Sequence, residues 1–148
     1  MKTNCSVFHN HFSRALRREI VRLAEMYDAK IFVDECHATG FFGATGRGTD
    51  EYWNVMGKVD IINSTLGKAL GGATGGYTTG RQGVVDVLRQ KARPYLFSNT
   101  LAPPVVGASL EVFRILSEDA SLPAKVQAST HYFRDRMTQA GFTITGAT

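Results

Sequence analysis

Lys68 has the setting of a lysine that could do covalent chemistry. It follows a short β-rich stretch, Val59–Asn63, and lies inside the glycine-rich run STLGKALGGATGGY of Ser64–Tyr77. A lysine in such a turn has few packing partners, and its amine can form a Schiff base with an aldehyde cofactor. A plain surface lysine is the alternative from spacing alone. A phosphate-binding P-loop is excluded, because it requires Gly at the position of Ile62 and Ser or Thr at the position of Ala69.

Asp34 is the acid that such a lysine would need if the aldehyde were pyridoxal 5′-phosphate (PLP). An acid facing the pyridinium nitrogen keeps the PLP ring protonated, so that the ring can accept electrons. Asp34 follows the short β-rich stretch Lys30–Val33. In an α/β sheet, ligands bind outside the carboxyl ends of the strands, which places Asp34 and Lys68 at one edge. A turn or cap residue is the alternative interpretation of Asp34 alone.

His37 and Thr65 could complete the contacts of the ring and its phosphate. His37 lies three residues after Asp34 and could touch the ring or its phenolic oxygen, or transfer a proton. Thr65 lies three residues before Lys68 and could offer a hydroxyl to phosphate. A structural histidine and a simple turn threonine are the alternatives.

A second polar cluster, Ser98–Asn99–Thr100, follows a predicted strand at Tyr95–Ser98, with Arg93 just before it. Hydroxyl, amide and guanidinium groups together suit an anion site. The alternative is an N-cap for the helix that begins at Pro103.

The elements that must position these residues alternate between helix and strand, which indicates an α/β fold. Pro103 suits a first helical turn, and Gly141 suits a helix end. We see neither an internal repeat nor a low-complexity tract. The residue pattern predicts helices over 13–27, 81–92, 103–116 and 123–140, strands over 30–33, 59–63, 73–78 and 95–98, a loop over 40–50 and a new strand starting at Phe142.

The composition and charge of the chain limit the classes of function that it can have. The 148 residues are 43% hydrophobic and 20% charged, values typical of a folded globular domain. The net charge of +4 suits an anionic ligand, but no basic run with aromatic partners indicates nucleic-acid binding. No apolar run approaches the length of a membrane span. Cys5 and Cys36 form no disulfide framework, and the histidines and cysteines lack the paired spacing of a zinc site, so we expect no metal.

Three stretches together resemble the α-oxoamine synthase family of PLP enzymes, over roughly Ala24 to Gly146. VDECHATGFFGATGRG (33–48) resembles the family's Asp-x-x-His block, and STLGKALGGATGGY (64–77) its PLP-lysine block. RPYLFSNTLAPP (93–104) resembles the segment that reaches the neighbouring subunit's site. Within the family, the sequences of these motifs resemble the members that condense glycine with acetyl-CoA more than they resemble the 5-aminolevulinate and 8-amino-7-oxononanoate synthases.

The resemblance implies a role for each matching residue. Lys68 would form the Schiff base with PLP, Asp34 would pair with the pyridinium nitrogen, and His37 would lie against the phenolic oxygen and assist acyl transfer. Thr65 would bind the phosphate. Ser98 and Asn99 would reach the phosphate in the other protomer of a homodimer.

The implied reaction is an acyl transfer from acetyl-CoA to glycine, giving 2-amino-3-oxobutyrate and CoA. Threonine dehydrogenase would be the pathway neighbour in threonine breakdown. The implied compartment is the bacterial cytoplasm or the mitochondrial matrix, and residues 1–18 carry no clear targeting signal.

The resemblance further implies part of the large domain of a fold-type I PLP-dependent transferase, aspartate aminotransferase-like, with an incomplete three-layer α/β/α sheet. We expect an irregular segment at 1–12, a partial PLP-binding domain at 13–120, and at 121–148 a helix and the start of a truncated C-terminal small domain. Family members are far longer, so the segments that stack on the ring and bind the substrate carboxylate have no counterpart here. A catalytically inactive remnant that acts only in dimerisation, and a nucleotide-binding α/β module, are the competing hypotheses; the second lacks both of its glycine motifs.

Overall fold

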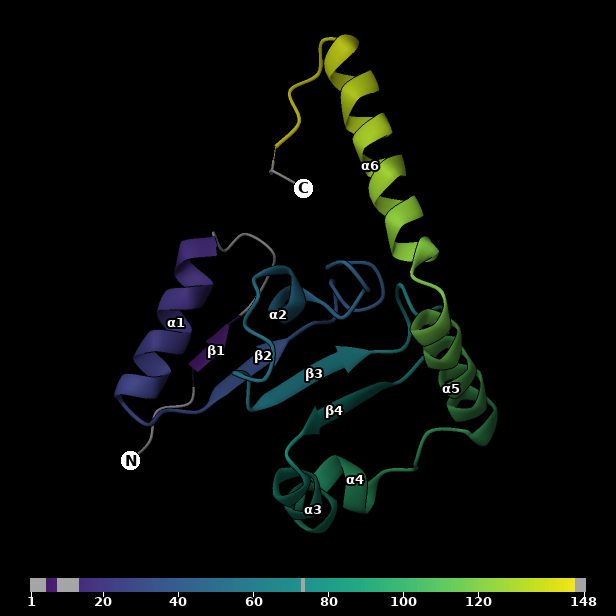
Figure 1. Cartoon of the computed structure of the whole chain (residues 1–148). Helices are drawn as coiled ribbons and strands as arrows, with labels where there is room; N and C mark the ends of the chain where they lie inside the picture. Colours follow the sequence, from purple (N-terminus) through teal and green to yellow (C-terminus); the bar gives the residue numbers. More distant parts are fainter. Residues whose placement is uncertain (1–4, 8–13, 73, 146–148) are drawn as a thin grey trace.

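Four short strands form one mixed sheet in the computed structural model of the chain, which describes residues 5–7, 14–72 and 74–145 (Figure 1). β1 (Cys5–Val7), β2 (Ile31–Asp34) and β3 (Ile61–Thr65) are parallel, and β4 (Gly76–Gly80) runs antiparallel to β3. The order of the strands in space is their order along the chain. The carboxyl ends of β2 and β3 therefore lie at the same edge of the sheet.

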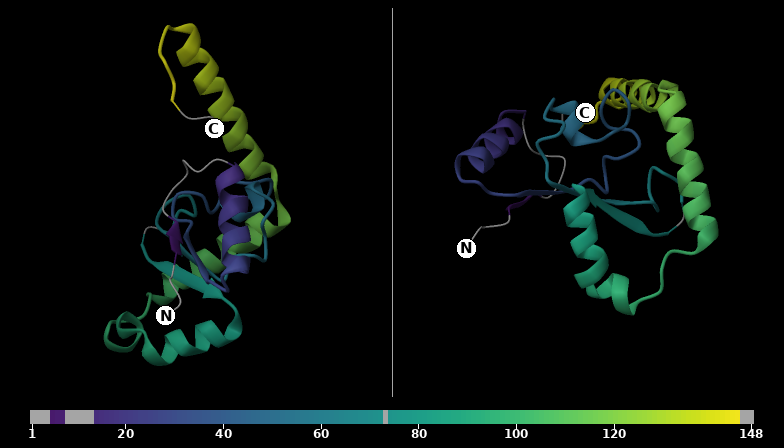
Figure 2. Two further views of the ribbon diagram at one scale, coloured as in Figure 1. Left: turned by 90° about the vertical axis from the view of Figure 1, so that its left-hand side faces the viewer. Right: turned by 60° about the horizontal axis from the view of Figure 1, so that its bottom comes forward.

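Six helices accompany the sheet in the described ranges. α6 extends away from the sheet in Figure 1 and in the left panel of Figure 2. Strands and helices in this mixed arrangement confirm the predicted α/β fold class, and the layers around the sheet are incomplete. The helices are α1 (Arg14–Met26), α2 (Thr49–Tyr52), α3 (Gln82–Lys91), α4 (Arg93–Phe97), α5 (Pro103–Glu118) and α6 (Ser121–Gln139).

Local sequence explains where the long helices begin and end. α5 starts at Pro103, whose fixed φ suits a first helical turn and whose missing N–H costs no hydrogen bond there. α6 ends at Gln139, and Gly141 then takes a φ of 89°, a conformation that glycine adopts without strain. The predicted helices at 13–27, 81–92, 103–116 and 123–140 are thus confirmed, within the residues described and with small shifts of their ends.

The buried core lies around the carboxyl ends of β2 and β3. Burying these side chains fixes the sheet edge from which the candidate site residues emerge. Apart from Pro123 on α6, the buried aliphatic side chains in the described ranges come from the segment between Ile31 and Leu70. They are Ile31, Val33, Ala38, Val55, Leu66 and Leu70.

The long helices leave much of their apolar surface open to solvent. On α5, the predicted apolar face of Val106, Leu110 and Phe113 is exposed by 39, 65 and 39%, although the Phe113 ring contacts Tyr77. Val126 and Phe133 of α6 are also exposed. Exposed apolar side chains that recur on one helix face are more typical of a contact surface than of a face in water.

The predicted strand at Tyr95–Ser98 is wrong, because Arg93–Phe97 forms α4. Pro94 lies in the first turn of α4, where proline is favoured. The aromatic and aliphatic residues of this stretch read equally as strand or helix over so few positions.

Two chain-end predictions also require correction. Residues 1–12 were expected to be irregular, yet Cys5–Val7 pairs with β2 as a parallel strand; residues 1–4 and 8–12 lie outside the described ranges. The strand expected from Phe142 is absent over 142–145, because alternation alone cannot form a strand without a partner to pair with. The strand predicted at 73–78 is β4, shifted to Gly76–Gly80. The three-part domain division stays a prediction.

Candidate active site

The turns after β2 and β3 bring His37 and Lys68 together. Lys68 Nζ lies 2.9 Å from His37 Nε2, and both side chains are exposed. Adjacent parallel strands place their carboxyl ends side by side, and the two turns extend from that shared edge. The structure thus unites the predicted lysine and the predicted histidine in one hydrogen-bonded contact.

Asp34 ends β2 at the same edge and orders the turn that carries His37. Its Oδ1 accepts a hydrogen bond from the Cys36 backbone N–H at 2.8 Å, and its side chain is half-buried. Burial raises the pKa of the Cys36 thiol, and the hydrogen bond and charge of Asp34 raise it further, whereas the charge of Lys68 opposes the shift. Asp34, Cys36 and Lys68 therefore share one electrostatic environment.

Thr65 closes the glycine-rich turn before Lys68. Its Oγ1 donates to the Gly75 carbonyl at 3.1 Å and accepts from the Gly67 N–H at 3.2 Å. Close packing explains one glycine in this turn, because a Cβ on Gly72 would lie 2.8 Å from the Leu66 carbonyl oxygen. The Thr65 hydroxyl thus shapes the turn of Lys68, and its contact with phosphate stays a prediction.

Ser98 and Asn99 lie in the link between α4 and α5 (Figure 1), and no hydrogen bond described for either residue reaches Lys68. Both are exposed, and the Ser98 N–H donates to the Pro94 carbonyl at 3.1 Å. The structure therefore does not bring this pair to Lys68 within one chain. Their predicted role lies across a subunit boundary, so that role stays a prediction.

Sequence reasoning missed Glu35, which is only 1% exposed. Its Oε2 accepts the Thr49 backbone N–H at 2.9 Å, and its Oε1 accepts the Thr49 hydroxyl. From the sequence alone, a glutamate next to Asp34 is expected to be a second exposed acid. The only available signal was the glycine-rich stretch before Thr49, which allows the chain to fold back over Glu35.

The loop between Gly40 and Gly48 is held in a fixed shape by hydrogen bonds. Gly40 N–H donates to the Gly46 carbonyl at 2.8 Å. The Glu51 carboxylate accepts from the backbone N–H groups of Thr45 and Arg47. Partial burial raises the pKa of Glu51, but the hydrogen bond from the Thr45 hydroxyl, these two backbone hydrogen bonds and the charge of Arg47 together hold that pKa below its ordinary value. α6 rests on the same loop, since Gln127 Nε2 donates to the Gly43 carbonyl at 3.1 Å.

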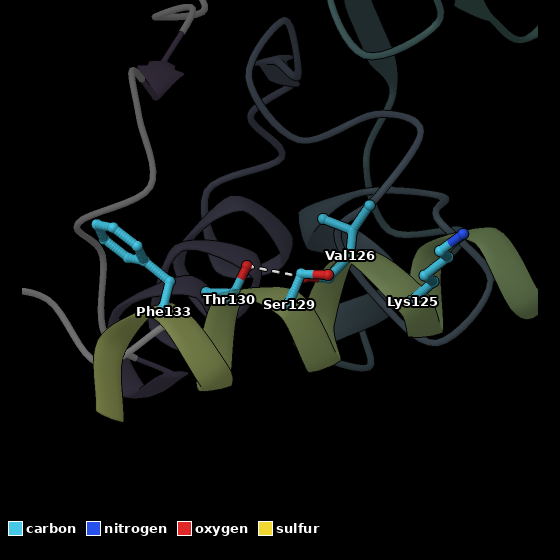
Figure 3. A pocket seen from close by; sticks show the side chains of 5 residues that line it. All are labelled: Lys125, Val126, Ser129, Thr130 and Phe133. Carbon is cyan, nitrogen blue, oxygen red and sulfur yellow. Dashed lines mark hydrogen bonds between the residues drawn. The ribbon is translucent and has the colours of Figure 1, made fainter. Parts of the chain in front are cut away.

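A shallow groove also lies along α6, far along the chain from Lys68 (Figure 3). Val126 and Phe133 give it an apolar character, and the Thr130 hydroxyl is turned back to the Val126 carbonyl at 2.9 Å. None of the six predicted site residues lines it. Its lining consists of Lys125, Val126, Ser129, Thr130 and Phe133.

No helix among the described residues combines the length and the apolar character needed to cross a membrane.

Comparison with known proteins supports the resemblance seen in the motifs. The sequence profile described as aminotransferase class I and II matches residues 11–148. The chain is 58% identical over 130 residues to the mitochondrial 2-amino-3-ketobutyrate coenzyme A ligase of Mus musculus, and 54% identical over 125 residues to the corresponding ligase of Escherichia coli K12. These matches cover 88% and 84% of this chain. The chain spans only 31% of the length of each relative.

A solved structure extends the similarity to three dimensions. A single-residue variant of a protein described as "SPT with PLP" superposes with a TM-score of 0.78 at 28% identity, covering 86% of this chain and 32% of that one. These findings confirm the family resemblance seen in the three motifs and the predicted fold class.

Proposed function

Because this chain belongs to the aminotransferase class I and II family, we propose that it forms the central part of a PLP-dependent acyltransferase that joins glycine to acetyl-CoA. The observation that carries the proposal is the 2.9 Å contact between Lys68 and His37 at the sheet edge where Asp34 ends β2. Relatives that share more than half of their aligned residues with this chain are named as ligases of 2-amino-3-ketobutyrate and coenzyme A. The 2-amino-3-ketobutyrate in these names is the product of the proposed reaction, also called 2-amino-3-oxobutyrate.

The residues present fit PLP at this edge. Lys68 offers an exposed amine, and the Asp34 carboxylate lies at the strand end on the same edge. In our proposal, Lys68 binds the cofactor's aldehyde and Asp34 pairs with its pyridinium nitrogen. When bound, PLP supplies an electron sink for charge that develops on the glycine α-carbon. Thr65, and across a homodimer interface Ser98 and Asn99, would hold the phosphate.

The chain's own groups would move the protons of the reaction. Lys68 Nζ is the base that we assign to the α-proton of glycine. His37 Nε2 lies within hydrogen-bond distance of that amine, so it can orient Lys68 and share its proton. Asp34 holds negative charge where a cation must be stabilised. Threonine dehydrogenase as the pathway neighbour belongs to the same proposal.

The proposed cofactor site can be tested by titrating the purified chain with PLP and following the visible absorbance band of a lysine adduct. Borohydride reduction and peptide mapping then locate the modified lysine. We expect the adduct on Lys68 and its loss in Lys68→Ala. The matched control is Lys58→Ala, because Lys58 is an exposed lysine that pairs with Glu25 outside the site.

The acyl transfer itself is tested by release of the CoA thiol from acetyl-CoA in the presence of glycine. Other acyl-CoA donors are run in parallel, because the relatives include an 8-amino-7-oxononanoate synthase that is 42% identical over 124 residues. A folded chain that forms no adduct on Lys68 would contradict the proposed cofactor site. An adduct without thiol release would limit this chain to cofactor binding.

A further inference from the structure

Glu35 places a buried carboxylate directly behind the turn that carries His37. Its side chain is 1% exposed, and it is among the largest fully buried side chains of the described residues. A carboxylate is almost never buried so completely without hydrogen-bond donors, because removing it from water carries a large free-energy cost. The two hydrogen bonds from Thr49 offset that cost. The proposed chemistry of Lys68 and Asp34 does not use this group.

The backbone of Glu35 makes several of the hydrogen bonds that hold the same turn. Its carbonyl accepts the N–H groups of Ala38 and Thr39 at 3.0 Å each, and its own N–H donates to the Asn63 carbonyl at 2.8 Å. The Ser64 hydroxyl also reaches the Glu35 carbonyl, at 3.4 Å. Residue 35 therefore joins β3 to the turn, and His37 lies inside the closed turn.

The side chain of Glu35 connects this turn to the end of the loop between Gly40 and Gly48. Thr49 begins α2, fourteen residues after Glu35, and is 2% exposed. Gly48 has a φ of 107°, and a Cβ there would lie 2.6 Å from Glu35 Oε2. Glycine at 48 thus permits the close approach, and Thr49 donates through both its N–H and its hydroxyl.

We infer that Glu35 is a positioning residue: through Thr49 it locks the turn that holds His37 against Lys68. The inference rests on the proposed function only in its claim that the contact between His37 and Lys68 serves catalysis. The contact itself is a property of the chain without cofactor. If the two hydrogen bonds from Thr49 are removed or weakened, the turn gains freedom and the 2.9 Å contact is populated less.

The test measures how fast diethylpyrocarbonate modifies His37 in the full chain without cofactor, followed by peptide mapping and mass spectrometry. This reagent attacks an imidazole nitrogen, so a nitrogen held by Lys68 reacts more slowly than a released one. Lys68→Ala gives the rate without the contact. His131 on α6 is exposed and outside the site, so its rate is the internal reference in every variant.

Four variants separate positioning from general destabilisation. Thr49→Val removes the hydroxyl at nearly constant side-chain volume, whereas Thr49→Ser keeps a hydroxyl at this position. Glu35→Gln keeps the shape of the side chain and removes its charge. Glu51→Gln is the matched control, because the Glu51 carboxylate holds the same loop through the N–H groups of Thr45 and Arg47 rather than through Thr49.

We expect Thr49→Val and Glu35→Gln to raise the His37 rate roughly three- to tenfold, toward that of Lys68→Ala. Thr49→Ser and Glu51→Gln should keep the parent rate, and His131 should not change. Equal His37 rates in the parent and in Thr49→Val would overturn the inference, as would an equal rise in Glu51→Gln. An unchanged rate in Lys68→Ala would overturn it too, since there would be no contact to position. Failure to bind PLP would affect only the proposed function.

Discussion

Lys68 and His37 are 31 positions apart in the chain, and their side-chain nitrogens lie 2.9 Å from each other. The contact depends on two neighbouring parallel strands that deliver both turns to one edge of the sheet. The charges and the packing at this edge determine several measurable properties of the chain.

Replacing Asp34 by Asn should weaken PLP binding much more than it weakens the fold. Asn keeps an oxygen that can accept the Cys36 N–H, but it removes the charge assigned to the pyridinium nitrogen. We expect roughly tenfold or greater loss of PLP affinity in a spectroscopic titration, because a charged pair is worth at least about 1.4 kcal/mol in such a site. Asp60→Asn is the control, since Asp60 accepts the Ile31 N–H at the opposite end of β2. Equal losses in both variants would argue against the assignment.

The alkylation rate of Cys36 should report the charges around it. Burial and Asp34 raise the thiol pKa, so the rate should rise with pH later than for an ordinary cysteine. Asp34→Asn removes a raising influence and should move the midpoint to lower pH. Lys68→Ala removes a lowering influence and should move it to higher pH. The measurement is the pH dependence of iodoacetamide labelling in a Cys5→Ser background, and shifts of the same sign in both variants would contradict it.

Removing a core side chain should cost far more stability than removing an exposed one. Leu66 is 4% exposed, so Leu66→Ala should lower the free energy of unfolding by about 2–5 kcal/mol. Leu110 is 65% exposed on α5, so Leu110→Ala should change it by less than about 0.5 kcal/mol. Urea unfolding followed by circular dichroism measures both values. Similar costs would mean that the apolar face of α5 is covered in solution.

Two glycines should respond to alanine in opposite directions. A Cβ on Gly72 would lie 2.8 Å from the Leu66 carbonyl, so Gly72→Ala should shift the turn of Lys68 and destabilise the chain. A Cβ on Gly83 meets no atom within 4 Å, and Gly83 lies in α3, so Gly83→Ala should stabilise the chain by about 0.5–1 kcal/mol. Thermal unfolding measures both changes. Stabilisation by Gly72→Ala would show that the close approach is not maintained.

Sequence alone predicted where the candidate site residues lie in the sheet better than it predicted the contacts that hold them, and their roles stay predictions. Lys68, Asp34 and His37 could be placed because each follows a recognisable strand, and strand ends converge by a general rule. Glu35 could not be predicted as buried, because its burial depends on the return of the chain at Thr49. That return is a tertiary event, and the glycine-rich stretch before Thr49 is its only local signal.

The secondary structure shows the same division between local and distant determinants. Pro103 marked the start of α5 and Gly141 the end of α6 correctly, because the preferences of proline and glycine are local. The stretch Tyr95–Phe97 was assigned to the wrong element type, since its aromatic and aliphatic residues suit a strand as well as a helix. The apolar face of Val106, Leu110 and Phe113 was predicted as a face, but its exposure could not be.

The order of the strands in space, which is also their order along the chain, has a consequence for synthesis on the ribosome. β2, β3 and β4 each emerge next to a partner that has already been made, so the sheet can grow by one strand at a time without waiting for a distant segment. Pairings between neighbours in sequence close the shorter loops, and shorter loops form faster. The edge that carries Lys68 and His37 can thus form once β3 and its following turn have left the exit tunnel, before α5 and α6 have left it.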